Sequence, residues 1–267
     1  MRLTRNNTAC AAVSVLAAAG SPATAGDYLK DGDVYVSLSG AAVFQQDSDN
    51  EGVFPDGFTT GAGASIPAGT ALPAGSAVGW STEFNTGFAT SGAVGFAYRS
   101  GFRSELEVSY QEANVDAHTG VSAAGIDLSA EDAGVLITGS NNIGVNVADL
   151  VADGQGELNA LYVMANVYYD FKIAGRVTPY VGGGVGVAFA NVDYVPSGVS
   201  IIEDDQTAFA YQLMAGLTVP VAPRVDAFVG YRYRATEDLD ARADLFVADF
   251  EIENRASQAE AGFRVRF

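Results

Sequence analysis

The feature that most constrains this chain is a regular alternation of apolar and polar residues, repeated over segments of about ten residues. Leu106 and Val108 alternate with Glu105 and Glu107, which makes 102–111 the clearest of these segments. Alternation with a period of two predicts a β-strand that has one apolar and one polar face. Eight such strands are expected, at residues 34–44, 88–99, 102–111, 159–171, 178–190, 209–218, 224–234 and 258–267.

The connections between these segments alternate between short and long. The short ones are 100–101, 172–176 and 221–224, and the long ones are 45–86, 112–157, 193–206 and 235–249. Tight turns at one end and long loops at the other are typical of a barrel in an outer membrane. We therefore expect an all-β fold, a transmembrane eight-stranded antiparallel up-and-down β-barrel with short periplasmic turns and long external loops. The two longest loops are expected to be structureless, which a compact soluble domain rarely tolerates.

Aromatic residues gather near both ends of the expected strands, as in the two belts that a bilayer selects. Those near the short turns are Tyr98, Phe102, Tyr169 and Phe171, and those nearer the long loops are Phe44, Phe88, Phe189 and Tyr231. The last strand places Phe263, Val265 and Phe267 on its apolar face. We expect this strand to pair with the first, because an open sheet edge cannot be hydrated inside a bilayer.

The first 25 residues read as a secretory signal peptide. Arg2 and Arg5 precede an apolar run at 11–19 that is too short to span a bilayer, and small residues precede Gly26. We expect cleavage before Gly26, so that 26–267 forms the barrel domain. The single cysteine, Cys10, would leave with the signal and take any disulfide or thiol chemistry with it.

Charge excludes nucleic acid as a partner. The whole chain has a formal net charge of −18, and the signal would remove two arginines and no acid. A strongly acidic protein is repelled by the phosphate backbone. After the signal, no apolar run approaches the roughly 20 residues that a transmembrane helix needs.

Three stretches resemble a known family: "LNALYVMANVYYDF" at 158–171, "VTPYVGGGVGVAF" at 177–189, and "FAYQLMAGLTVPVAPRVDAFVGYRYRAT" at 209–236. They look like the core of opacity-type or surface-antigen (outer-membrane protein A-like) barrels. The resemblance implies an eight-stranded barrel surrounded by the lipid of the outer membrane of a Gram-negative bacterium. The terminal alternation with Phe263, Val265 and Phe267 resembles the assembly signal that the barrel-assembly machinery recognises.

The inward faces of the expected strands collect charges of both signs. The expected lumen charge network comprises Arg103, Glu105, Glu107, Asp226, Arg232, Glu260 and Arg264, with Arg99, Arg224, Arg266 and Asp170 on the same faces. The interior of an eight-stranded barrel is just wide enough for side chains to fill it. That width favours a packed plug of ion pairs over the alternative, a narrow gated pore.

The first three long loops carry many acids and neither Lys nor Arg. Simple solvation of a surface rich in Gly, Ala and Ser is the favoured interpretation. Weak binding of divalent cations, or of a basic surface partner, is the alternative. In "DSDNEG", Asp47, Asp49, Glu51 and Gly52 match the first half of a calcium loop, but Phe58 stands where a bidentate Glu is needed. We therefore predict no metal site.

Catalysis has little support in the sequence. His118 is the only histidine, and it lies two residues after Asp116 in the second long loop, where we expect it to be exposed. A catalytic His needs a nucleophile and an orienting acid within hydrogen-bond reach. We predict no catalytic residue and no cofactor. The expected function is that of a non-enzymatic outer-membrane surface protein, with a role in envelope structure or surface interaction. The alternative is a narrow porin-like channel for ions or small solutes.

Overall fold

A computed structural model describes eight stretches of the chain: 32–63, 66–137, 139–152, 156–173, 176–194, 202–237, 239–242 and 249–267. The predicted signal peptide at 1–25, with its cleavage before Gly26, lies outside the described residues. Over the stretches that are described, no helix has the length and apolar character needed to cross a bilayer.

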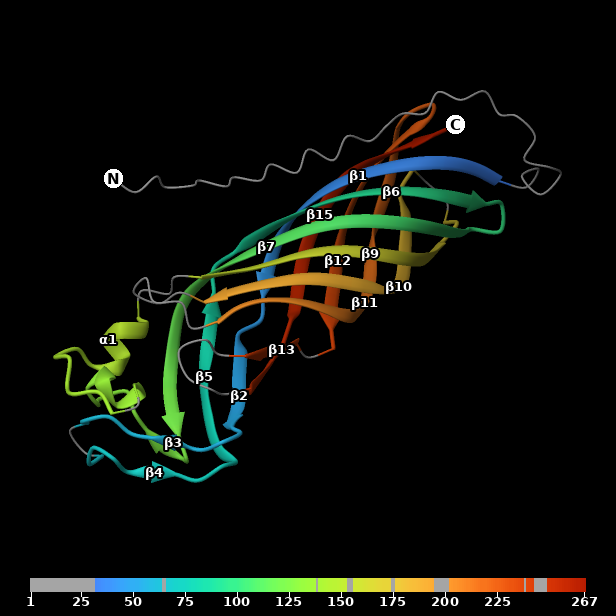
Figure 1. Cartoon of the computed structure of the whole chain (residues 1–267). Helices are drawn as coiled ribbons and strands as arrows, with labels where there is room; N and C mark the ends of the chain where they lie inside the picture. Colours follow the sequence, from blue (N-terminus) through green and yellow to red (C-terminus); the bar gives the residue numbers. More distant parts are fainter. Residues whose placement is uncertain are drawn as a thin grey trace, which may run out of the picture.

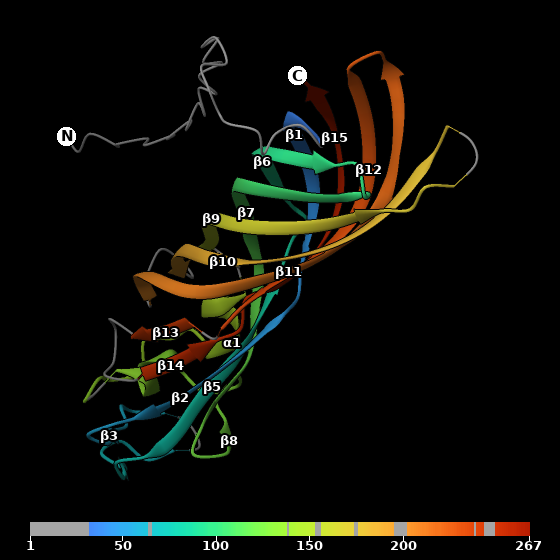
Figure 2. The ribbon, with the colours of Figure 1, turned by 90° about the vertical axis from the view of Figure 1, so that its right-hand side faces the viewer.

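Eight strands close into a ring. Figures 1 and 2 show their curved sheet from two sides. They are β1 (Gly32–Gln45), β6 (Gly87–Tyr98), β7 (Phe102–Ala123), β9 (Gly156–Asp170), β10 (Thr178–Tyr194), β11 (Ile202–Ala222), β12 (Val225–Thr236) and β15 (Arg255–Arg266). Every neighbouring pair in this order is antiparallel, and β15 returns to pair with β1. The predicted fold class, an eight-stranded antiparallel up-and-down barrel, is confirmed.

The first and last strands close the barrel. Their ladder runs from Tyr35 opposite Arg266 to Gln45 opposite Ala256. The backbone N–H of Phe267 donates to the carbonyl of Val34 at 2.9 Å, so the pairing extends to the final residue. The backbone groups of β1 and β15 thus find their partners within the protein, as a bilayer requires.

The two faces of the barrel reverse the pattern of a soluble protein. Leu106 and Leu213 are each 61% exposed on the exterior, whereas Arg103 and Arg234 are almost completely buried inside. All the residues of the two expected aromatic belts are exposed as well: Tyr98, Phe102, Tyr169, Phe171, Phe44, Phe88, Phe189 and Tyr231. An apolar exterior flanked by aromatic residues matches the surface that contacts lipid in outer-membrane barrels.

The long loops are not structureless, and this expectation was wrong. Residues of the first, second and fourth loops form a second sheet from β2 (Ser48–Phe54), β5 (Ser76–Phe84), the end of β7, β13 (Leu239–Arg242) and β14 (Asp249–Ile252). Smaller elements add to it: β3 (Phe58–Thr59), β4 (Ala71–Leu72), β8 (Ile126–Asp127), a 3₁₀ helix (Ala133–Leu136) and α1 (Val147–Val151). We call this unit the lobe. It lies beyond one end of the barrel (Figure 1). Its buried apolar residues form one cluster with residues of the adjoining ends of β9, β10 and β11.

The lobe sheet continues one side of the barrel. Its strand order β14-β2-β5-β7 repeats the barrel order β15-β1-β6-β7, and each lobe strand leads directly into its barrel counterpart. Backbone hydrogen bonds bridge the short interruptions, from Gln46 N to Arg255 O at 2.8 Å and from Asn85 N to Asn114 O at 2.9 Å. In Figure 2 the two sheets follow one another with a change of direction.

Two β-bulges in β7 accompany this change of direction. Opposite β5, strand β7 carries an extra residue at Asp116 and another near Gly120, where the pairing register shifts. Gly120 has a φ of +66°, a conformation that favours glycine. Each bulge bends its strand and moves the following side chains to the other face. Val115, His118 and Val121 are buried in β7. Successive buried residues are thus three positions apart here, and the period of two is broken.

Candidate functional site in the barrel lumen

The structure places the expected lumen charges on the inside of the barrel. Arg103, Glu107, Asp226, Arg232, Glu260 and Arg264 are buried residues, and the side chain of Glu105 is only 6% exposed. Strand alternation explains the placement, because the outward neighbours of these residues are apolar and face lipid. Two further expected members lie elsewhere. Arg99 and Arg224 are exposed in the short turns, since the strands end before them.

Glu107 on β7 is the centre of the network. Its carboxylate pairs with Arg232 across the lumen and with Arg234 Nη2 at 2.9 Å, both from β12. Asn166 Nδ2 on β9 donates to the second carboxylate oxygen at 2.8 Å. Glu107 is only 1% exposed. A buried carboxylate is tolerated when its charge and its lone pairs both find partners, as they do here.

Two residues extend this layer across the lumen. Arg232 Nη2 pairs with Glu260 on β15 at 2.8 Å, so the two arginines at the centre face two carboxylates. The side-chain oxygen of Gln212 on β11 accepts from Arg232 Nη1 at 3.0 Å and from Arg234 Nε at 2.9 Å. The amide of Gln212 donates in turn to Asn166 Oδ1 at 2.7 Å. Each polar group thus fixes the position of its neighbours, which rigidifies a buried network.

A second layer surrounds Arg103, nearer the short turns. Its Nε lies 2.9 Å from Asp170 and its Nη1 lies 3.1 Å from Glu105. The guanidinium also lies over the ring of Tyr168, 4.3 Å from the centroid, and 5.4 Å from that of Tyr180. The hydroxyl of Tyr35 donates to Glu105 at 2.6 Å. Aromatic rings thus fill the space that the ion pairs leave, and cation–π attraction adds to them.

Arg264 behaves differently from the other buried arginines. Its guanidinium lies 4.9 Å from the ring centroid of Tyr35 and 5.7 Å from that of Phe228. The described residues provide no carboxylate within 4.0 Å of it, although the sequence placed it in a network of expected ion pairs. Asp226 pairs with Arg266 Nη2 at 3.1 Å. Two rings hold Arg264 in place of a counter-charge.

A third layer, on the lobe side, consists mainly of amides. Gln258 Nε2 donates to Gln111 at 2.8 Å, Gln111 donates to Gln45 at 3.2 Å, and Gln45 donates to Asn254 at 3.2 Å. Asn254 Nδ2 donates to the hydroxyl of Tyr162 at 3.2 Å. The ring of Tyr162 lies 4.2 Å from the Arg234 guanidinium, which connects this layer to the central one.

Several members of this site were not predicted from the sequence. Arg234 was left out of the predicted network, and Gln212, Asn166 and Tyr168 were not predicted as partners. Alternation carried the necessary signal, because all four occupy inward positions of their strands. The predicted network contained only charged residues. It therefore left out the amide and phenol side chains that complete the hydrogen bonds of those charged residues.

His118 and Asp116 do not form a catalytic pair. His118 is buried in the lobe, contrary to the expected exposure, and its Nδ1 lies 2.9 Å from Thr82 Oγ1. Asp116 is exposed and accepts from Asn85 Nδ2 at 3.0 Å. The bulge at Asp116 explains the separation, because it turns His118 toward the interior while Asp116 faces outward.

The acids expected in a calcium-like loop lie on a strand. Asp49 and Glu51 are exposed on β2, with Asn50 buried between them, and Asp49 accepts from Ser81 Oγ at 2.6 Å. On a strand these acids point to the same face but stand in a line, about 7 Å from one to the next, so they cannot surround one ion as a turn would. Among the described residues there is no group of three or more side chains with the geometry of a metal site.

Another acid, Asp132, organises the backbone of the lobe. Its Oδ1 accepts from the N–H groups of Gly134 at 2.9 Å and Ile143 at 2.8 Å, and its Oδ2 accepts from Gly144 at 2.7 Å. Desolvation acts to raise the pKa of this carboxyl, but the backbone donors outweigh it and hold the pKa below its ordinary value. At least one loop acid thus has a structural task beyond solvation.

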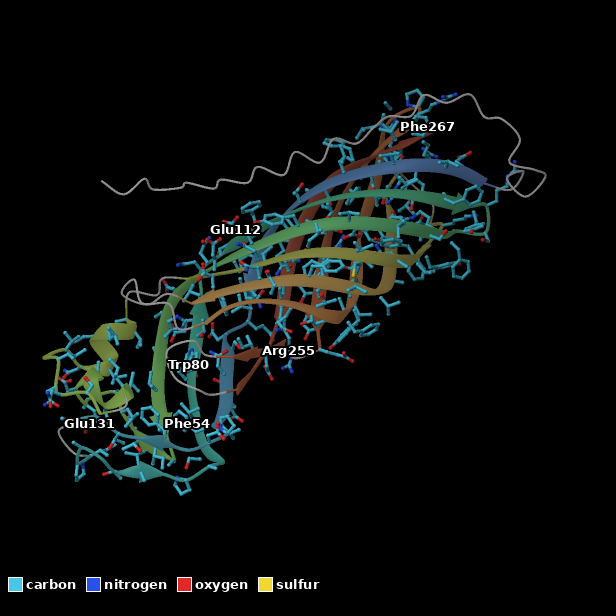
Figure 3. The ribbon with its side chains drawn as sticks, viewed as in Figure 1. Phe54, Trp80, Glu112, Glu131, Arg255 and Phe267 are labelled. Atoms are coloured by element: carbon cyan, nitrogen blue, oxygen red, sulfur yellow. The ribbon has the colours of Figure 1, made fainter. Side chains whose placement is uncertain are left out.

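The residues of the predicted assembly signal lie on the barrel exterior. Phe263, Val265 and Phe267 are all exposed, and Phe267 is the most exposed of them at 69%. Figure 3 shows Phe267 at the end of the barrel opposite the lobe. Its role in assembly stays a prediction.

Comparison with known proteins identifies the family. A family model described as surface antigen matches residues 58–263, which is most of the chain. An uncharacterised protein of Brucella abortus is 22% identical over 149 residues, covering 52% of this chain and 48% of that protein. A protein of Brucella melitensis matches to the same extent. The chain thus spans about half the length of the curated relatives it matches.

Several solved structures of outer-membrane and surface proteins align with this structure. Neisserial surface protein A has a TM-score of 0.43 and 17% identity, over 88% of this chain and 97% of that one. The outer membrane protein OprG of Pseudomonas aeruginosa has a TM-score of 0.41 and 13% identity, over 89% and 97%. The outer membrane protease OmpT of Escherichia coli has a TM-score of 0.40 and 11% identity, over 92% and 100%. This chain belongs to the surface antigen family of outer-membrane β-barrel proteins.

Proposed function

We propose that this protein is a non-enzymatic component of the outer membrane whose lumen is closed and whose lobe makes contacts at the cell surface. The observation that carries the proposal is the central layer of the lumen, where Glu107, Arg232, Arg234, Gln212 and Glu260 connect opposite sides of the barrel.

Energetics support a closed lumen. An ion that passes through must separate buried charge pairs, and removing one partner of such a pair costs on the order of 3–5 kcal/mol. The layers around Arg103 and Gln111 lie on either side of the central one and would have to open as well. Closure by side chains also suits an eight-stranded barrel, whose interior is narrow.

The folded lobe supports a role in surface contact. Its first two loops carry no Lys or Arg, so it presents an acidic surface outside the membrane. A basic surface partner, or weakly held divalent cations, would be attracted to it. Envelope lipid and the barrel-assembly machinery are the other partners that we propose.

The separate placement of Asp116 and His118 supports a non-enzymatic role, although one of the similar barrels is a protease.

A narrow channel is the second candidate function. A cavity of about 20 Å³ lies beside the central layer, lined in part by Ser91, Glu105 and Arg264. This volume holds roughly one or two waters, since a single water needs about 10–15 Å³. If the central layer opened, this polar cavity would form part of a path.

Single-channel recording in planar bilayers tests closure. The native protein should give no steady conductance, and Glu107→Ala combined with Arg232→Ala should open the central layer and produce one. Glu112→Ala combined with Arg255→Ala, outside that layer, is the matched control and should stay closed. Steady conductance of the native protein would replace this proposal with the channel. A double variant that stays closed would show that closure does not depend on the central layer.

A further inference from the structure

The lobe contains an apolar cavity that the proposed function does not use. It has a volume of about 70 Å³, against roughly 10–15 Å³ for a single water. Phe54, Trp80, Val121, Leu128 and Val135 contribute to its lining. Figure 3 shows Phe54 and Trp80 within the lobe, away from the barrel.

Four polar side-chain atoms of the lining are hydrogen-bonded within the protein: Thr60 Oγ1, Thr70 Oγ1, Trp80 Nε1 and His118 Nδ1. Thr60 Oγ1 donates to Pro67 O at 2.9 Å, and Thr70 Oγ1 donates to the same carbonyl at 2.7 Å. Trp80 Nε1 donates to Thr82 Oγ1 at 3.2 Å, and the same oxygen lies 2.9 Å from His118 Nδ1. The surface that remains for an occupant is hydrocarbon.

Water is a poor occupant of such a space. A buried water needs two to four polar partners, and apolar cavities of this kind stay dry and accept molecules such as benzene. A charged occupant is no better. The loops at 46–86 and 112–157, which supply the lining, carry no Lys or Arg to balance an anion. A cation would lose its hydration without gaining a carboxylate, because the lining contains no acid.

We infer that this cavity is a binding site for an uncharged hydrocarbon group about the size of a benzene ring or a short alkyl segment. The group can be a free small molecule or the end of a longer amphiphile, since both present the same chemistry to the lining. Burial of the ligand's apolar surface against Phe54, Trp80 and Leu128 provides the affinity. The site is independent of the barrel lumen and does not depend on whether the lumen conducts.

The chain carries a built-in reporter for this site. Trp80 is the only tryptophan in the sequence and forms part of the lining. Bromine quenches tryptophan emission only at close range, so bromobenzene serves as the probe. The protein is reconstituted in lipid nanodiscs, because detergent chains would compete for an apolar cavity. We expect bromobenzene to quench Trp80 in a saturable manner. 4-Bromobenzoate, which carries a charge, should quench far less.

Substitutions locate the binding. Val121→Phe fills the cavity and should abolish the saturable quenching. Val53→Phe adds the same bulk at an exposed position of β2 outside the lining, and should leave quenching intact. Leu128→Ala enlarges the cavity and should strengthen quenching by the bulkier bromonaphthalene, which keeps the test decisive if Val121→Phe does not fold. A terminally brominated long-chain alcohol shows whether the end of an amphiphile also enters.

Two outcomes would overturn the inference. One is a native protein whose Trp80 emission bromobenzene leaves unchanged. The other is quenching that rises linearly and equally in the native protein, Val121→Phe and Leu128→Ala, which would reflect probe dissolved in the bilayer.

Discussion

At the scale of single residues, Glu107 determines how the inside of the barrel is organised. Two arginines from the opposite side of the lumen share its carboxylate, and an asparagine occupies the remaining oxygen. Burial makes each of these contacts dependent on the others, because a guanidinium without a carboxylate cannot be rehydrated in this space.

Replacing Glu107 with alanine should lower the free energy of unfolding by about 3–5 kcal/mol, because Arg232 loses one of its carboxylates and Arg234 loses the one that pairs with it among the described residues. Unfolding in denaturant, measured in lipid vesicles, provides the value. Glu112→Ala on the same strand is the control and should change stability by less than about 1 kcal/mol. Adding Arg234→Met to Glu107→Ala should restore part of the loss, because Arg232 still pairs with Glu260. A double variant no more stable than Glu107→Ala would contradict this view of the layer.

Arg264 leads to a different prediction. Two aromatic rings hold its guanidinium, so Arg264→Ala should cost about 2 kcal/mol, the range of a desolvated cation–π contact. Neutralising Glu105 in the same protein should give no rescue, because Glu105 pairs with Arg103. The same unfolding assay compares Arg264→Ala with the double variant Arg264→Ala, Glu105→Gln. A double variant that is more stable than Arg264→Ala would show that Arg264 balances the carboxylate of Glu105.

At the scale of elements, strand β7 determines both the barrel and the lobe. Its first half is a regular strand with strict alternation, which the sequence reveals. Its second half contains the bulges at Asp116 and Gly120, and each bulge shifts the alternation by one residue. After Gln111 the polarity of the alternation also reverses, since Ala113 and Val115 are buried and Asn114 is exposed, and the period of two ends at the first bulge. That is why 112–123 were expected in a loop.

Asp132 offers a test of how the lobe's backbone is held. Asp132→Asn should keep the acceptor for Gly134 and Ile143 but place an amide donor against the N–H of Gly144, so exchange of the Gly144 amide should accelerate most. Amide hydrogen exchange followed by NMR provides the measurement. Asp127→Asn is the control. Asp127 accepts from the backbone N–H of Ser129, which is a different backbone group from the three that Asp132 holds.

The same carboxyl gives a pH dependence. Its pKa lies below the ordinary value when folded, so its stabilising effect is complete above about pH 4 and is lost as the pH falls through the folded pKa. Protection of the Gly144 amide should follow this course after correction for the intrinsic exchange rate. Protection that stays constant down to about pH 2 would argue against a role for the ionised form.

The last strand provides a separate prediction about assembly. Phe267 is highly exposed and its backbone bond to Val34 lies at the end of the ladder, so its deletion should cost little stability. We expect the deletion to reduce membrane-integrated protein in cells and to leave refolding in detergent nearly normal. Phe171→Ala, another exposed aromatic near the short turns, is the control for lipid contact. Equal losses in both assays would assign Phe267 to packing.

At the scale of the whole molecule, the structured loops should resist proteolysis. Glu51 and Glu83 lie in the paired strands β2 and β5, so a glutamate-specific protease should leave the bonds after them intact in the membrane-embedded protein. The same bonds should be cut after denaturation, as mass spectrometry of the fragments would show. Rapid cleavage after Glu51 in the native protein would mean that the lobe sheet does not persist in the membrane.

The sequence predicts the barrel well and the lobe poorly, for a physical reason. Lipid imposes a strict apolar face on every barrel strand, and residues such as Leu106 and Leu213 display it. The lobe has no such constraint. Asn50, Thr82 and His118 are buried there in a hydrogen-bonded chain, so its interior positions do not read as apolar. The charges of the lumen follow from alternation, whereas their partners depend on register and cross-barrel distances that a single sequence does not contain.

The continuity of the two sheets has a mechanical consequence. Most displayed domains hang from a membrane anchor by single-chain linkers and can rotate freely. Here several adjacent hydrogen-bonded strands pass from the barrel into the lobe, and backbone bonds at Gln46 and Asn85 bridge the junction. Rotation of the lobe would have to break this ladder at several places together. We therefore expect the lobe to keep one orientation relative to the barrel axis, so that each copy in a membrane would present the same face outward.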